Sequence, residues 1–398
     1  MRSVPLLSRV SLVSLASLAS LLSLALASVA VGAGCSSSTS AAATPAPATG
    51  DAGASADAGP GVDAAPVACS DPAATPDQPC GTLSWTASST LSRKRNHHVT
   101  FVAKTGQGPF LYVIGGGDGA QTWANVDRAA LAADGSIGAF VDQTVTPKPV
   151  AGLTGGVVTI GTTNVIVIAG GTNLRVTDQA FSTVVGDDGT LAAWKPAGSV
   201  LQNRMHPGAF VVGDTIYVLG GFNDPSVWDD LVRAKVSADG TVSAWTAAGK
   251  LPGPRSHMSV SFADGYVYLT GGLAKSAFGN PPVQRDVSRG RLLEDGTVGE
   301  WTPMPEFPTA IATHSSFVYG GYLYAGGGID DTMQLKTMWR APIGADHALG
   351  AWKAVADLPI ARGHVHQLPV LGNHVYSVAG AVDFDLNSSD QIAIGTFL

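Results

Sequence analysis

Residues 208–221 read GAFVVGDTIYVLGG, which is two short apolar runs separated by Gly213-Asp214 and followed by the pair Gly220-Gly221. The runs have the composition of β-strands. The Gly-Asp pair supplies the positive φ that a two-residue hairpin turn requires. We therefore expect residues 208–219 to form an antiparallel hairpin.

Two further strands are expected downstream of this hairpin. Residues 231–236, LVRAKV, and residues 241–245, TVSAW, are separated by the turn residues Asp239-Gly240. Together with the hairpin they predict an antiparallel sheet of four strands, with its outer strand ending at Trp245.

The same pattern recurs along the chain. Small-residue pairs end an apolar strand every 50–56 residues, at Gly115-Gly116, Gly170-Gly171, Gly220-Gly221, Gly271-Gly272, Gly327-Gly328 and Ala379-Gly380. A second register of aromatic residues has nearly the same spacing, at Trp85, Phe140, Trp194, Trp245, Trp301 and Trp352. A repeat of this length that contains strands and no helices predicts an all-β propeller of four-stranded blades.

The two ends of the chain complement each other. The last repeat has three expected strands, at residues 364–371, 374–378 and 391–398. Residues 81–85, GTLSW, resemble the fourth strand of a repeat but have no repeat of their own. We predict six blades, with the N-terminal strand paired beside the C-terminal one, because this closes the ring and removes exposed strand edges.

The glycine pair after an apolar-aromatic strand and the downstream tryptophan resemble kelch repeats over residues 81–398. Repeat 2 is the weakest copy, with Val167 where the other repeats have tyrosine. Phe140 replaces tryptophan in repeat 1, and Ala379 replaces the first glycine in repeat 6. Kelch propellers include the bacterial sialic-acid epimerases, which are exported and carry polar residues at the channel mouth, so the resemblance also implies an alternative function as a sugar-acid isomerase or mutarotase.

The N-terminal 80 residues have a different composition. Residues 1–34 contain two arginines and then a charge-free stretch rich in Leu, Ala, Val and Ser, which is typical of an export signal. The small residues before Cys35 resemble a lipobox, which predicts acylation of this cysteine and anchoring to the outer membrane. A cleaved soluble signal, giving a secreted protein, and an uncleaved anchor are the alternatives. Residues 35–67, almost wholly Ser, Ala, Thr, Pro, Gly and Asp, predict a flexible tether.

Two cysteines and the net charge restrict the remaining possibilities. Cys69 and Cys80 flank a proline-rich loop, residues 68–80, and in an exported protein we expect them to form a disulfide; free thiols are the alternative. The net charge of −7 and the absence of a long basic run argue against nucleic acid as a partner. We expect a monomer.

The residues that open the inner strands are the first candidate site. The arginines and histidines at these positions are Arg95, His97, Arg204, His206, Arg255, His257, His314, Arg362 and His364. Each Arg-x-His pair would share one face of a strand, and pairs that point inward would form a cationic ring able to bind a carboxylate or sugar acid. The alternative is that these residues hold the repeats together.

Metal sites have weaker support. His364 and His366 have the spacing of two ligands on one strand face, but the sequence identifies no third ligand. Asp383, Asp385 and Asn387 alternate as in a calcium loop, although Ser388 and Ile394 replace the glycine and glutamate of that motif. We expect no cofactor, and a calcium ion held by this loop is the alternative.

Aromatic residues outside the repeat register mark the second candidate site. Trp123, Trp228, Phe278 and Trp339 lie in or beside the loops that follow the glycine pairs. Exposed aromatic side chains in such loops offer rigid contact surface for a glycan or a surface protein; packing over the sheet ends is the alternative. We expect a binding protein without catalytic activity, which recognises its partner on this face.

Overall fold

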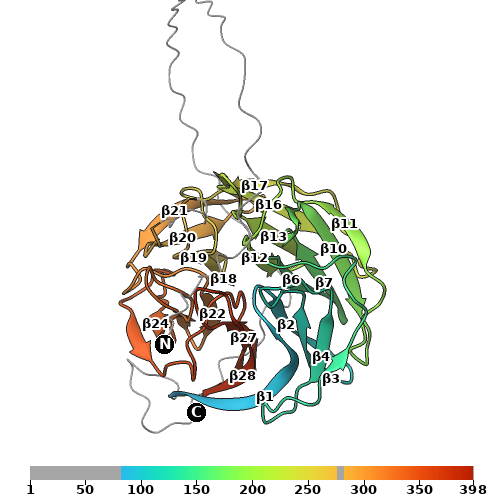
Figure 1. The fold of residues 1–398 in the computed structure, drawn as a ribbon. Helices are drawn as coiled ribbons and strands as arrows, with labels where there is room; N and C mark the ends of the chain where they lie inside the picture. The colour runs from blue at the N-terminus through green and yellow to red at the C-terminus, as the bar shows by residue number, and fades with distance from the viewer. Residues whose placement is uncertain (1–81, 276–281, 398) are drawn as a thin grey trace, which may run out of the picture. The chain divides into compact units, whose positions relative to one another are not determined.

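The computed structural model describes residues 82–275 and 282–397, and every regular element in these ranges is a β-strand (Figure 1). No helix in these ranges has the length and apolar character needed to cross a membrane. The expected export signal, the tether and the cysteines Cys35, Cys69 and Cys80 lie outside the described residues.

The strands form sheets that follow the sequence repeats, numbered 1 to 6 from Gly115-Gly116 to Ala379-Gly380. Repeat 1 contains β2 (Val99–Thr105), β3 (Gly108–Ile114), β4 (Val126–Ala130) and β5 (Val141–Asp142). Repeat 2 contains β6 (Thr154–Ile160), β7 (Thr163–Ala169), β10 (Gln179–Val185) and β11 (Lys195–Ser199). Repeat 5 contains β22 (Ser315–Tyr319), β23 (Tyr322–Gly326), β24 (Met338–Pro342) and β25 (Lys353–Val355).

Repeats 3 and 4 share one eight-stranded sheet. Repeat 3 contains β12 (Gly208–Val212), β13 (Thr215–Leu219), β16 (Asp230–Lys235) and β17 (Thr246–Lys250). Repeat 4 contains β18 (Ser259–Ala263), β19 (Tyr266–Thr270), β20 (Val287–Leu292) and β21 (Val298–Met304). Within each repeat the pairing is antiparallel, and the two halves meet through one parallel contact between Gly249 and Val298.

Two small ribbons stand in the loops after the glycine pairs. They are β8 (Thr172–Asn173) with β9 (Arg175–Val176), and β14 (Phe222–Asn223) with β15 (Ser226–Val227). Each loop is closed at its base by backbone hydrogen bonds, such as Trp228 N–H to the carbonyl of Gly221. The loops after the glycine pairs of repeats 1 to 5 therefore share the same hydrogen bond at their base, although their lengths differ.

The expected pairing of the two chain ends is present. In repeat 6, β26 (Val370–Leu371), β27 (His374–Ala381) and β28 (Ser388–Phe397) are joined by β1 (Leu83–Arg95), which runs antiparallel to β28 (Figure 1). Leu83 pairs with Phe397, and Trp85 pairs with Gly395. Because β1 is followed by β2 after only three residues, the chain passes directly from the last sheet to the first.

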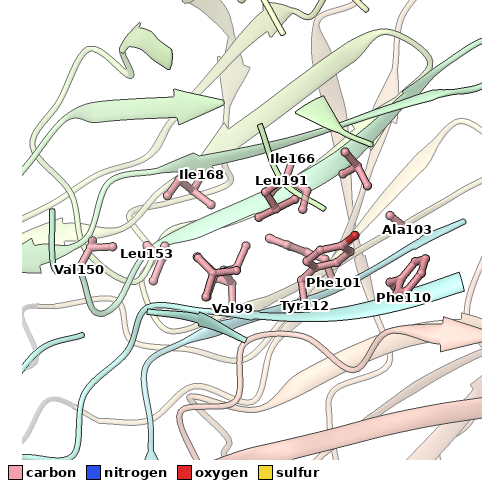
Figure 2. Close-up of a cluster of buried hydrophobic side chains, with 13 residues drawn as sticks. Val99, Phe101, Ala103, Phe110, Tyr112, Val150, Leu153, Ile166, Ile168 and Leu191 are labelled. Atoms are coloured by element: carbon pink, nitrogen blue, oxygen red, sulfur yellow. The ribbon is translucent and has the colours of Figure 1, made fainter. Parts of the chain in front are cut away.

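Apolar cores lie between successive sheets. Figure 2 shows the core between repeats 1 and 2, where Phe101 and Tyr112 from β2 and β3 meet Ile166 and Ile168 from β7. Equivalent buried clusters lie between each later pair of repeats and between repeats 6 and 1, where Leu111 packs with Tyr376. Each sheet therefore buries both of its faces against its neighbours.

The outer strands differ from the sequence expectation in position. β17 begins at Thr246, so Trp245 precedes the strand instead of ending it. The residues after the Asp-Gly turn form only a single β-bridge, between Val236 and Val242. The indole of Trp245 then lies against the neighbouring repeat. There Trp245 donates its Nε1–H to the carbonyl of Ala197 over 2.8 Å.

The other tryptophans of this register do the same. Each donates its indole N–H to a backbone carbonyl of the preceding repeat: Trp85 to Ala356, Trp194 to Thr144, Trp301 to Lys250 and Trp352 to Pro305, over 2.7–3.1 Å. Phe140 in repeat 1 has no N–H for this bond. The tryptophans of the aromatic register thus link each repeat to the preceding one by a hydrogen bond.

The repeat tyrosines make a second set of bonds between repeats. Tyr112 donates its hydroxyl to the carbonyl of Gly189, in the Asp-Gly turn of the next repeat, and Tyr217 does so to Gly296. Val167 in repeat 2 lacks a hydroxyl, and Ser182 on the adjacent β10 instead donates to Gly240 over 2.6 Å. The weakest repeat therefore keeps the link by another side chain.

Candidate functional site

A closed ring of backbone hydrogen bonds lies where the inner strands begin, with one residue from each repeat. In every case the N–H donates to the carbonyl of the counterpart in the preceding repeat, over 2.8–3.1 Å. The pairs are His97 to His364, Gly152 to His97, His206 to Gly152, His257 to His206, Thr313 to His257 and His364 to Thr313. We call this the axial ring.

All members of the axial ring have left-handed backbone conformations, with φ between 52° and 65°. The expectation that each Arg-x-His pair shares one face of a strand is therefore wrong, because the histidine is not in an extended backbone. The chain turns at His206, so its imidazole lies at the ring while Arg204 extends into its own repeat. Histidine is among the few non-glycine residues enriched in this conformation.

The imidazoles of the axial ring are stacked in two pairs. His97 stacks on His364 with ring centroids 4.0 Å apart, and His206 stacks on His257 at 3.9 Å. The two stacks meet edge to face, with 4.9 Å between His97 and His206. His366, from the residues just after the ring, lies 5.3 Å from His206. These five side chains form the axial histidine cluster.

Burial determines the charge state of this cluster. It lowers the pKa of His97, His206, His257 and His364 well below 6.5, and the neighbouring imidazoles lower it further. Burial also lowers the pKa of His366 to about 4. The cluster is therefore neutral at pH 7, and it does not form the cationic ring that is one of the two alternatives for these residues.

The arginines are used within their own repeats. Arg204 donates to the carbonyl of Gly220 over 2.7 Å and makes a bidentate ion pair with Asp230, over 3.0 and 2.6 Å. The same arrangement joins Arg255 to Gly271 and Asp286. In repeat 1, Arg95 bonds to Gly115 and pairs with Asp127. These guanidinium groups are buried and link the inner strand to the third strand.

Sequence reasoning missed the aspartates, although a signal for two of them is present in the chain. Asp230 in repeat 3 and Asp286 in repeat 4 stand at the same position, just ahead of the third strand's core residues. Repeats 2 and 5 have Val150 and Ile311 in place of the arginine, and Gln179 and Thr337 occupy the aspartate position there. Arginine and aspartate are thus present together or absent together in these four repeats.

Two predicted residues depart from this arrangement. Arg362 donates to the carbonyls of Ser377, Ala379 and Gln391 and has no ion pair within residues 82–275 and 282–397, and burial lowers its pKa to about 10. His314 is not in the cluster, because Thr313 takes the ring position of repeat 5. Its Nε2 instead lies 2.7 Å from the hydroxyl of Thr270.

The described part of the chain has no group of three His, Cys, Asp or Glu side chains arranged to hold a metal ion. His364 and His366 do have imidazole neighbours: His97 stacks on His364, and His206 lies tilted beside His366 with ring centroids 5.3 Å apart. In the predicted calcium loop, Asp383 accepts hydrogen bonds from the backbone and side chain of Asn387, over 3.0 and 2.7 Å.

Comparisons with known proteins support the same architecture. No family model matches the chain. Alpha-scruin of Limulus polyphemus is 33% identical over 94 residues, which is 24% of this chain and 10% of that protein. The kelch repeat and BTB domain-containing protein 1 of horsepox virus is 27% identical over 150 residues, 36% of this chain and 24% of that protein.

The N-acetylneuraminate epimerase of Escherichia coli K12 is 29% identical over 122 residues, 30% of each chain. The solved structure of YjhT superimposes with a TM-score of 0.60 at 12% identity, covering 78% of this chain and 99% of that one. The domain is a kelch-type β-propeller. The chain spans less than two fifths of the length of each of these curated relatives.

The loop tryptophans of the propeller are half-buried at its loop face. Trp123 and Trp228 occupy the same place in repeats 1 and 3, where each closes the base of its loop on a glycine carbonyl. Trp228 also donates its indole N–H to the carbonyl of Asn203. Trp339 packs in the core between repeats 4 and 5, and Phe278 lies outside the described residues. Each described indole is therefore partly covered by the protein itself, and only part of its surface is exposed.

Exposed apolar side chains of the propeller gather on one face. This loop face carries the loops after the glycine pairs and the links between repeats. Among the described residues, six of the seven large hydrophobic side chains that are exposed lie on it: Val145, Leu174, Leu201, Met333, Val382 and Phe384. The seventh, Val141, is in the outer strand β5.

Proposed function

We propose that this propeller has six blades, one for each repeat, and serves as a non-catalytic binding domain whose loop face recognises a glycan or a surface protein. One observation carries the proposal. The arginines that open the inner strands are paired with aspartates, and the histidines of the axial ring stack on one another. The exposed apolar side chains, in contrast, are concentrated on the loop face.

The arginines support this reading because a ligand carboxylate would have to displace an existing partner. Arg204 has no exposed surface, and its guanidinium already contacts both carboxylate oxygens of Asp230 and the carbonyls of Gly220 and Val200. The stacked imidazoles offer flat apolar faces to one another. A general acid or base instead needs a ring nitrogen within hydrogen-bond reach of the substrate atom that gains or loses the proton.

The site of action is also a proposal. We infer that residues 1–34 direct export, that Cys35 is acylated, that residues 35–67 tether the domain, and that Cys69 and Cys80 form a disulfide. The chain would then act as a monomer outside the cytoplasm, at the outer membrane. Labelling with a palmitate analogue tests the anchor: the native chain should be labelled and the Cys35→Ser variant should not.

A second candidate is a sugar-acid isomerase or mutarotase at the channel mouth. It is favoured by the similarity to the N-acetylneuraminate epimerases and by the YjhT fold. Exchange between the anomers of N-acetylneuraminate, followed by NMR with and without the full chain, separates the two candidates. Acceleration above the spontaneous rate would favour the enzyme.

The binding proposal is tested by blocking one face at a time. The full chain is screened on glycan and peptide arrays, and the hits are then measured with Met333→Cys and Glu294→Cys variants that carry a maleimide-linked polyethylene glycol. Met333 is on the loop face, and Glu294 is beside the Asp295-Gly296 turn on the opposite face. Binding should fall only when the loop face is blocked. Loss only in the Glu294→Cys conjugate would contradict the proposal.

A further inference from the structure

The loops of repeats 5, 6 and 1 form one continuous part of the loop face. Gln334 in the repeat 5 loop donates its side-chain amide to the carbonyl of Asp383 in the repeat 6 loop over 2.7 Å. Asn96, at the start of repeat 1, donates to the carbonyl of Leu386 over 2.8 Å. Ser388 donates to the carbonyl of Gly117 over 3.3 Å. These bonds hold the three loops side by side.

Apolar side chains project from this region. Met333 is 58% exposed, Phe384 is 54% exposed and Val382 is 38% exposed. Gln334 follows Met333 in the chain, and Asp383 precedes Phe384. The hydrogen bond between Gln334 and Asp383 therefore holds the backbone beside Met333 close to the backbone beside Phe384. Apolar groups held outward on tied loops lose little entropy when a partner covers them, which favours binding.

Carboxylates lie in the same three loops as these apolar groups. They are Asp118 in the repeat 1 loop, Asp330 and Asp331 in the repeat 5 loop, and Asp383 and Asp385 in the repeat 6 loop. Residues 117–125 and 382–390 contain no lysine or arginine. The basic residues nearest to these loops in the chain are Arg128, whose guanidinium donates to the carbonyl of Asp188 in a turn of the opposite face, and Lys336, whose Nζ lies 3.5 Å from Asp357. The region is therefore negative.

The opposite face of the propeller differs in this respect. Its Asp-Gly turns also carry carboxylates, but cations lie beside them: Arg128 beside Asp188, Lys195 beside Asp239 and Arg233 beside Asp295. The negative charge of the repeat 5, 6 and 1 loops is thus a local feature and not a general property of the surface.

From these observations we propose that the surface formed by Met333, Val382, Phe384 and their neighbouring aspartates docks a cationic amphipathic polypeptide segment. We call it the acidic docking surface. The proposal rests on the proposed binding function and narrows it to one partner class. Lysine or arginine side chains would meet the carboxylates, while apolar side chains of the partner would cover Met333 and Phe384. An anionic glycan would be repelled.

The test uses the full chain and three fluorescent twelve-residue peptides: one alternating Lys and Leu, one alternating Glu and Leu, and one alternating Lys and Ser. The Lys-Leu peptide should bind at least about tenfold more tightly than either of the others, because only it satisfies both the charge and the apolar contact. Its affinity should also fall as salt rises. Equal binding of the Glu-Leu peptide would overturn the proposal.

Two variants locate the binding, and each has a matched control. Met333→Ser with Phe384→Ser removes the apolar groups, and Asp331→Asn with Asp385→Asn removes exposed charge. Each double variant should lower the affinity for the Lys-Leu peptide at least about tenfold. Leu174→Ser, a fully exposed leucine in another loop, and Glu294→Gln, on the opposite face, should change it less than about twofold. Unchanged urea midpoints establish that all variants fold.

The remaining outcomes are also decisive. If Leu174→Ser weakens binding as much as the double variants, the loop face binds but the acidic docking surface is wrong. If calorimetry with calcium chloride shows binding that Asp385→Asn abolishes, and the Lys-Leu peptide does not bind, the aspartates hold an ion and the proposal is overturned. If array hits depend on the loop face while no cationic peptide binds, the proposed function survives and this inference fails.

Discussion

Trp85 donates its indole N–H to the backbone carbonyl of Ala356 over 3.1 Å, across 271 residues of chain. The tryptophan belongs to the first described strand, and its acceptor belongs to repeat 5. The bond is the same as those that Trp194, Trp301 and Trp352 make to their preceding repeats. Trp85 therefore completes repeat 6 and links the two ends of the fold.

Trp85→Phe should lower the free energy of unfolding by about 1 kcal/mol, because the ring stays in its apolar contact and only a partly exposed hydrogen bond is lost. Trp352→Phe is the matched control, since it removes the equivalent bond to Pro305. Hydrogen exchange distinguishes the two variants: amides of β28 should lose protection only in Trp85→Phe. Equal loss in both would contradict the role of Trp85 in closing the fold.

The buried ion pair of repeat 3 can be tested against the composition of repeat 2. Arg204→Val alone should destabilise the protein by about 3 kcal/mol, and Asp230→Gln alone by somewhat less, because each leaves a charge without its partner. The double variant reproduces the Val150 and Gln179 of repeat 2. Measured by urea unfolding, the double variant should lose less free energy of unfolding than the two single variants lose together. Strict additivity would show that the two side chains are not coupled.

Ala379 is expected to be a strained position. It has a φ of 53°, which matches the first glycine of the other pairs. Ala379→Gly should therefore raise the free energy of unfolding by about 1 kcal/mol. Gly220→Ala should have the opposite effect, because the added Cβ would lie 2.2 Å from the carbonyl oxygen of Arg255. Thermal unfolding of both variants checks the prediction, and a stabilised Gly220→Ala protein would refute it.

The axial histidine cluster should make stability depend on pH. Burial lowers the folded-state pKa of its members, and of His366 to about 4, whereas the unfolded chain titrates near the ordinary value of 6.5. The unfolded state therefore binds more protons between these values, and the free energy of unfolding falls as pH falls from about 6.5 toward 4.

Urea midpoints at pH 7.5, 6, 5 and 4.5 measure this fall. His366→Gln should reduce its slope, by up to about 1.4 kcal/mol per pH unit for one histidine. His347→Asn is the control, because His347 lies outside the cluster and stacks on Tyr266. A slope that stays the same in His366→Gln would show that the cluster does not govern the acid response.

The strands and their order follow from local chemistry that a single sequence displays. Apolar alternation, Asp-Gly turns and the glycine pairs are short-range signals, so the hairpins and the pairing of β1 with β28 could be predicted from them. The aromatic register indicated that each repeat needs a tryptophan, but not that the indole bonds to the neighbouring repeat.

The site was harder to predict because it depends on backbone geometry. Nothing in the sequence marks His206 as left-handed, and an extended backbone there would have placed it on the same face as Arg204. The partners Asp230 and Asp286 lie more than twenty residues from their arginines. Only a comparison among the repeats themselves shows that the two residue types occur together.

The closed bases of the loops give this fold a modular character. In repeats 1 to 5 the carbonyl of the second glycine accepts a backbone hydrogen bond from the residue that ends the loop, whether the loop is short or long. A loop can therefore be exchanged for another without altering the sheets beneath it. A loop of another sequence grafted into repeat 3 should close on the same base, and this makes the chain a scaffold on which different loop sequences can be combined.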